Sequence, residues 1–239
     1  MRKIVMTALM VILLTLGLSV GCDGVVVTGS GNLETETLNF SNFTKIEAHN
    51  GFQLELTKSS AFSVEITTDD NVQKYIDVDT SGETLRIELK GVRIYSSVTL
   101  RAKITMPNLY KIDLSGGSRA SIIGFGSSGD FSVELSGGSR IDGDIATADA
   151  DFDLSGGSQV ILAGSANDLV VKGSGGSQFD LEAFSVNNAD INLSGGSRAT
   201  VNVDGTLNVD LSGGSQVIYV GEPARGDISL SGESTLNRK

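Results

Sequence analysis

A short polar sequence, Leu-Ser-Gly-Gly-Ser, recurs with small variations through the second half of the chain, and an arginine or a glutamine follows six of its copies. Guanidinium and amide groups offer several hydrogen-bonding atoms in a fixed arrangement, and a regular spacing repeats that arrangement along a surface. One hypothesis is therefore a binding strip for a repeating polymer such as a polysaccharide. The strip would consist of Arg119, Arg140, Gln159, Gln178, Arg198 and Gln216.

The sequence favours a structural role for these residues. Serine hydroxyls and glutamine amides that recur at one position can bond from repeat to repeat, and the arginines can pair with acids that precede the motif. Those acids include Asp113, Glu134, Asp153 and Asp210. A variant without the three arginines would separate the two roles: loss of folding indicates a structural ladder, and loss of glycan retention by a folded protein indicates binding.

Catalytic and metal chemistry have less support in the sequence. One histidine, His49, and one cysteine, Cys22, cannot supply a His/Cys metal cluster, and we expect no Ser-His-Asp set around a single histidine. Paired carboxylates on an outer groove can hydrolyse polysaccharides, so a polysaccharide-acting enzyme is the rival class. Its candidate acids are Asp142, Asp144, Asp149, Asp151 and Asp153. Solvated turn acids are the simpler interpretation, and we expect no catalytic residue, no metal and no cofactor.

The N-terminus has the pattern of a secretory signal. Basic Met1-Arg2-Lys3 precedes an apolar run from Ile4 to Val20, which ends at Gly21-Cys22. The run is also long enough for an uncleaved membrane anchor. Ser19-Val20-Gly21-Cys22 resembles the lipobox of bacterial lipoproteins, although Ser19 stands where that family usually has leucine. The resemblance implies that residues 1–21 are removed, that the Cys22 thiol carries lipid, and that residues 22–27 link the anchor to the folded part.

The charge of the chain excludes one class of partner. The 239 residues include 18 basic and 29 acidic residues, for a formal net charge of −11. Such a surface repels the phosphates of nucleic acids, so we expect no nucleic-acid partner.

The repeat predicts the fold. The first serines of seven copies stand at positions 115, 136, 155, 174, 194, 212 and 231, with spacings of 18–21 residues. Apolar and polar residues alternate on both sides of each Gly-Gly pair, which is the pattern of half-buried strands that meet at a corner. We predict an all-β, single-chain β-helix with coils of about 19–20 residues. Two interior columns follow, one of Ile112, Val133, Phe152, Val171, Ile191, Val209 and Ile228, and one of Leu114, Leu135, Leu154, Leu193, Leu211 and Leu230 with Gly173 as a gap.

The first half of the chain alternates in the same way but without the motif. Examples are 52–56, 62–66 and 98–104. We interpret residues 28–110 as wider, irregular coils that cap the regular β-helix of residues 111–239, with 28–239 forming one continuous domain.

Several segments in this order are similar to the head GIN domain family, whose members are called putative auto-transporter adhesins. The segments are Phe43-Thr44-Lys45-Ile46, Gly51-Phe52-Gln53-Leu54-Glu55-Leu56, Asp70-Asn71-Val72, Met106-Pro107, the repeated motif and Tyr219-Val220-Gly221-Glu222-Pro223. The resemblance covers about residues 28–236. It implies a β-helical fold, a right-handed coil and a surface or periplasmic lipoprotein, and it brings no catalytic residue.

These observations together indicate a non-catalytic, extracytoplasmic lipoprotein of a bacterial cell envelope. Its partners would be the membrane, through the N-terminal lipid, and a polysaccharide or another envelope component. The alternatives that stay open are a polysaccharide-acting enzyme and a purely structural or signalling-linked envelope module.

Overall fold

The computed structural model describes residues 26–91, 94–126 and 128–239. Cys22 and the predicted signal peptide lie outside this range. The described residues form 21 strands and one short 3-10 helix, η1 (Gln73–Tyr75), and they build a β-solenoid. None of their helices is long and apolar enough to span a bilayer.

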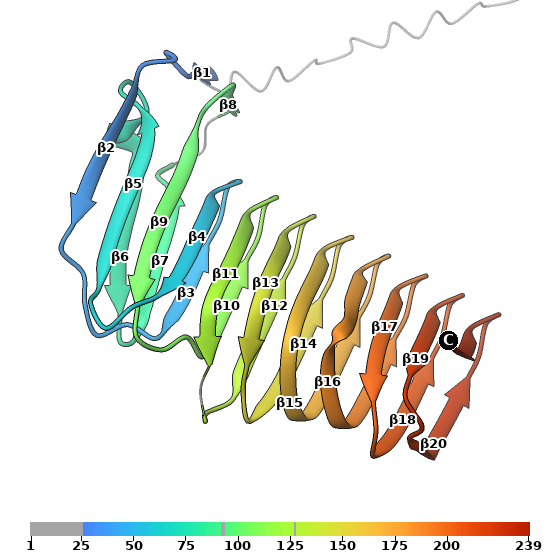
Figure 1. Cartoon of the computed structure of the whole chain (residues 1–239). Helices are drawn as coiled ribbons and strands as arrows, with labels where there is room; N and C mark the ends of the chain where they lie inside the picture. The colour runs from blue at the N-terminus through green and yellow to red at the C-terminus, as the bar shows by residue number, and fades with distance from the viewer. Residues whose placement is uncertain (1–25, 92–93, 127) are drawn as a thin grey trace, which may run out of the picture.

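The solenoid has two long faces, which we name by their position relative to the Gly-Gly corner (Figure 1). The leading face precedes the corner and the trailing face follows it. Strands β15 (Gln159–Gly173) and β16 (Gln178–Leu193) run from the trailing face into the next leading face. The other leading strands are β3 (Lys45–Ala48), β10 (Lys111–Leu114), β12 (Phe131–Leu135), β14 (Asp149–Leu154), β18 (Thr206–Leu211) and β20 (Ala224–Leu230). The other trailing strands are β4 (Gln53–Lys58), β11 (Arg119–Gly126), β13 (Arg140–Ala146), β17 (Arg198–Val203), β19 (Gln216–Val220) and β21 (Thr235–Arg238).

Each strand pairs in parallel with the equivalent strand of the next coil, and equivalent residues of the repeat stand in register. Val133 lies beside Ile112 and Phe152, and Leu135 beside Leu114 and Leu154. The predicted interior columns are therefore confirmed from Ile112 to Val209 and from Leu114 to Leu211, all of them buried. The gap at Gly173 is filled, because a Cβ there would lie 2.7 Å from atoms of Phe179 and Leu193.

The last members of both columns are not buried, which corrects the prediction. Ile228 and Leu230 stand in register with Val209 and Leu211, but they are 38% and 46% exposed. No further coil covers them among the described residues. The edge strand β20 is nevertheless protected from pairing, since it bulges between Arg225 and Ile228 and carries Arg225 at the core-facing position of Leu207. Inward charges and bulges are recognised defences of an exposed edge.

The corners explain the glycines. Gly116 and Gly117 both have positive φ (63° and 79°), as a type I′ turn requires at its two central residues. The buried hydroxyl of Ser118 donates to the carbonyl of Ser115 at 2.8 Å, and the same bond recurs in the later corners. The second serine of each motif thus closes its own turn.

The two glycines of a corner meet different constraints. A Cβ on the first glycine would lie 2.9–3.2 Å from a backbone nitrogen of the preceding corner, whereas a Cβ on the second would meet nothing closer than 3.9 Å. The end corners follow this rule. The last corner keeps Gly232 first and has Glu233 second, and the first corner has Asn50 and Gly51, where no Gly-Gly corner precedes it.

The first half differs from the predicted wide coils. Strands β3 and β4 do form one coil in register with β10 and β11. Beyond that coil, both faces continue into a β-sandwich whose strands are partly antiparallel (Figure 1). The trailing face adds β9 (Leu100–Met106), β5 (Ser63–Asp69) and β2 (Leu33–Leu38), and the leading face adds β7 (Thr84–Leu89) and β6 (Ile76–Ser81). A separate pair, β1 (Val26–Thr28) and β8 (Ile94–Ser96), lies at this end.

We predict that Gly137→Ala destabilises the protein more than Gly138→Ala. Both changes place a Cβ on a residue with positive φ, at a cost of about 1–2 kcal/mol. Only at Gly137 would the new Cβ also lie 3.2 Å from the Gly116 nitrogen, because nothing lies within 4 Å at Gly138. The midpoints of urea unfolding measure the difference, and equal midpoints would contradict this account of the corner.

Candidate functional site

The six predicted ladder residues form one column on the trailing face. Cα pairing joins Arg119 to Arg140, and then runs through Gln159, Gln178, Arg198 and Gln216 in successive coils. The backbone of each residue hydrogen-bonds to a neighbouring coil. For example, the Arg140 nitrogen donates to the carbonyl of Ser118 at 3.0 Å. The side chains lie on the outer surface and are half-buried or exposed. The backbone of a ladder residue thus bonds neighbouring coils, while its side chain faces outward.

As far as the described residues show, only the middle of the column has hydrogen bonds between its own side chains. The Arg140 guanidinium donates to the Gln159 amide oxygen and contacts the Asp142 carboxylate at 3.4 Å. The Gln159 amide donates to Gln178 at 3.5 Å. Among the described residues, no hydrogen bond or ion pair involves the guanidinium of Arg119 or Arg198, and both side chains are exposed. These two cations are available to a ligand.

The predicted pairing of the arginines with the acidic column is wrong. That column lies on the leading face, where Glu47, Asp113, Glu134 and Asp153 stand in register. Its ion pairs are with basic residues of the same face, Lys111 to Glu134 at 2.7 Å and Arg86 to Glu47 at 3.1 Å. Burial, and to a lesser extent the neighbouring Glu134, raise the pKa of Asp113. The Gly-Gly corner separates these acids from the arginines, which explains the difference.

The structure extends the ladder by two residues that the motif does not mark. Gln53 on β4 pairs with Arg119, and Arg101 on β9 pairs with Gln53. Both side chains are exposed, and they point to the same side of the sheet as Arg119 because paired residues do so. Neither residue follows a Gly-Gly-Ser sequence, so only strand register reveals them.

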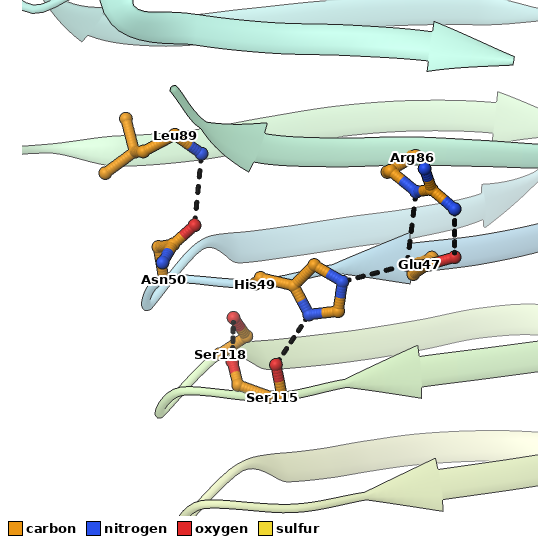
Figure 2. A network of polar contacts seen from close by, with 7 residues as sticks. All are labelled: Glu47, His49, Asn50, Arg86, Leu89, Ser115 and Ser118. Carbon is orange, nitrogen blue, oxygen red and sulfur yellow. Dashed lines mark hydrogen bonds and ion pairs between the residues drawn. The ribbon is translucent and has the colours of Figure 1, made fainter. Parts of the chain in front are cut away.

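A polar network joins the sandwich to the first regular coil (Figure 2). His49 contacts Glu47 through Nε2 at 2.9 Å and the Ser115 hydroxyl through Nδ1 at 2.5 Å. Arg86 donates to both Glu47 oxygens, at 3.1 and 3.4 Å. The amide oxygen of Asn50 accepts from the Leu89 nitrogen at 3.0 Å.

This network contains a serine, a histidine and a carboxylate in sequence, contrary to the expectation that His49 would have no such set. The contacts run along the stack, from Arg86 on β7 through Glu47 and His49 to Ser115 after β10. We therefore assign the network to holding three successive layers together. Burial opposes ionisation of Glu47, but the hydrogen bonds from His49 and Arg86 outweigh it and lower the pKa of this carboxyl group.

The acids considered for an enzyme are divided between two strands. Asp142 and Asp144 lie on β13, which pairs with β11 and β15, while Asp149, Asp151 and Asp153 lie on β14 of the leading face. Asp142 is engaged by Arg140. In the part of the chain that the structure describes, no three His, Cys, Asp or Glu residues form a metal-binding group.

The architecture and the ladder define a class: a β-solenoid with a β-sandwich at one end and a continuous polar column on its outer surface. Residues 42–223 match the family described as "Putative auto-transporter adhesin, head GIN domain", and the chain belongs to this family. The family groups the chain with surface or envelope proteins. No curated protein matches the sequence.

Solved structures share the fold. A putative adhesin from Bacteroides fragilis has a TM-score of 0.81 at 21% identity, over 89% of this chain and 100% of that one. A putative lipid binding protein from Parabacteroides distasonis has a TM-score of 0.73 at 16% identity, over 90% and 99% of the two chains. A putative adhesin from Parabacteroides merdae has a TM-score of 0.69 at 18% identity, over 90% and 100%.

Replacing Glu47 by glutamine should lower stability at neutral pH and have little effect in acid. The folded-state pKa of Glu47 lies below its ordinary value of 4.5, so its ionised form stabilises the fold above that pH. This contribution disappears as the pH falls through the folded-state pKa. Thermal midpoints of the parent and Glu47→Gln at pH 7 and pH 3 test this, and a gap that persists unchanged at pH 3 would contradict it.

Proposed function

We propose that this protein is a non-catalytic lipoprotein of the bacterial cell envelope that binds a polysaccharide along its polar ladder. Membership of an adhesin family supports a surface role. One observation carries the binding function: the guanidinium groups of Arg119 and Arg198 are exposed and have no partner among the described residues. A purely structural ladder does not need them.

The arrangement also suits a long, repeating ligand. Neighbouring coils are about 4.8 Å apart, so the column offers a polar side chain at each step over its whole length. The turn-closing work is done by the buried serines and not by the ladder side chains. The outer surface can therefore serve a ligand without cost to the corner.

Cys22 supplies the anchor in this proposal. The first described strand, β1, begins at Val26 and pairs with β8 at the sandwich end of the molecule. A lipid on Cys22 would therefore tether the closed end and leave the regular coils free to extend away. Stable attachment takes two or more acyl chains, which a lipoprotein cysteine carries.

The anchor is tested with Cys22→Ser in the full-length chain. We expect the parent protein in the membrane fraction, from which detergent releases it, and the variant largely in the soluble fraction or retained as unprocessed precursor. Labelling with a radioactive fatty acid should follow the parent only. Fatty-acid labelling of the serine variant would contradict the assignment of Cys22.

The ladder is tested with a triple variant, Arg119→Ser, Arg140→Ser and Arg198→Ser. We expect it to keep its circular dichroism spectrum and thermal midpoint within a few degrees, and to lose retention on immobilised polysaccharides that hold the parent. A variant with the same charge change on the leading face, Lys45→Ser, Lys111→Ser and Lys172→Ser, serves as control. Unfolding of the arginine variant, or undiminished retention, would overturn the binding function and favour a structural envelope module.

A further inference from the structure

The extended ladder enters a groove at the junction of the sandwich and the solenoid. The groove has a volume of about 530 Å³ and lies over strands β2, β5, β9, β4 and β11. Its lining includes Arg101, Gln53, Lys103 and Ile123. Ile123 is 43% exposed and lies two outward positions along β11 from Arg119, so the row that contains Ser121 separates it from the ladder.

Two rows of side chains cross this groove, and they differ in charge. One row runs through a pair of threonine hydroxyls, Thr35 and Thr67, to Arg101 and Gln53, and it continues to Arg119 just beyond the lining of the groove. The threonine hydroxyls are 2.7 Å apart, and this row contains no acid.

The second row runs through Glu65, Lys103 and Glu55 to Ser121. Lys103 contacts the Glu55 carboxylate at 3.5 Å, so part of the negative charge is balanced within the row. In contrast, no hydrogen bond or ion pair involves the Arg101 guanidinium among the described residues. Among the described residues, the cation of the groove lining that has no acidic partner is therefore Arg101, in the first row, and Arg119 follows it in register just outside the lining.

The spacing of those cations limits the ligand. Arg101 and Arg119 are two strand steps apart, or about 10 Å, with Gln53 between them. This distance is close to the repeat length of an extended disaccharide. The groove has no aromatic lining on which neutral sugar rings could stack, so charge and hydrogen bonds must supply the recognition.

We propose that this groove is the specificity-determining end of the ladder and that it binds an acidic polysaccharide with one carboxylate or sulfate per disaccharide. The inference rests on the proposed function, since it names the ligand class of the same column. Arg101 in the groove and Arg119 at its edge each bind one acidic group, and Gln53 hydrogen-bonds the sugar between them.

A second groove on the molecule does not fit such a ligand. It has a volume of about 510 Å³ and lies on the leading face near the open end. Its lining includes Asp190, Asp210 and Asp227 against one lysine, Lys172, so it repels anions. Acids outnumber bases in this second groove, whereas the lining of the groove at the junction balances Arg101 and Lys103 against Glu55 and Glu65.

The experiment compares three single variants by titration with hyaluronan, which has one carboxylate per disaccharide. We expect Arg101→Ser and Arg119→Ser each to weaken binding about tenfold, as the loss of one charge-assisted contact predicts, and Arg198→Ser to weaken it less than threefold. Polygalacturonate, with a carboxylate on each sugar, and neutral dextran complete the panel. The parent should bind hyaluronan more tightly than either.

The outcomes separate this inference from the proposed function. Equal losses of affinity in all three variants would refute the groove as the specificity-determining end, while the binding function of the ladder would stand. Tighter binding of dextran or polygalacturonate than of hyaluronan would refute the ligand class. If no acidic polymer binds, but neutral glycans retain the parent and not the triple arginine variant, the ligand class is refuted and the binding function of the ladder stands. No effect of any arginine would refute both.

Discussion

The structure depends on the stacking of one Gly-Gly corner directly on the next. A parallel coil has strands without partners of its own, so its backbone is satisfied only when the next coil stands in register. The type I′ corner sets that register, and the close approach of successive corners makes a Cβ on the first glycine crowd the backbone of the preceding corner. The buried serine that closes each turn, and the columns of Val, Ile, Leu and Phe inside, follow from the same repeat.

A stack of this kind must end, and the two ends are treated differently. At the N-terminal end, antiparallel strands extend both faces into a sandwich, and the Arg86–Glu47–His49–Ser115 network joins it to the first regular coil. At the other end, a bulge and the core-facing Arg225 and Arg238 discourage pairing, while Ile228 and Leu230 stay exposed. Arg225 donates to the Tyr219 hydroxyl, and Arg238 to Glu222. Both charges therefore have partners, the buried Tyr219 for Arg225 and the exposed Glu222 for Arg238.

The regular half could be predicted because its signal is redundant: period, alternation and glycine pairs all specify the same coil. The sandwich could not, because alternation identifies a strand but not its partner or direction. The same limit applies to the site. Arg119 and Arg198 follow a motif, whereas Gln53 and Arg101 join the column only through the register of β4 and β9. The contact between His49 and Ser115 spans 66 residues of sequence, and no local pattern indicates it.

The division of labour within the ladder follows from the stack. Backbone atoms and buried serines hold the coils, so outward side chains at the next position are free to carry a ligand surface. The account therefore rests on equivalent residues of neighbouring coils being adjacent in space.

The most direct measurement of this adjacency introduces cysteine pairs into a chain with Cys22→Ser. The account predicts that Asp153→Cys with Lys172→Cys forms a disulfide on mild oxidation, since their Cα atoms are in register on adjacent strands. Asp153→Cys with Asn192→Cys, two strands apart, should not; equal cross-linking of both pairs, or of neither, would contradict the stack.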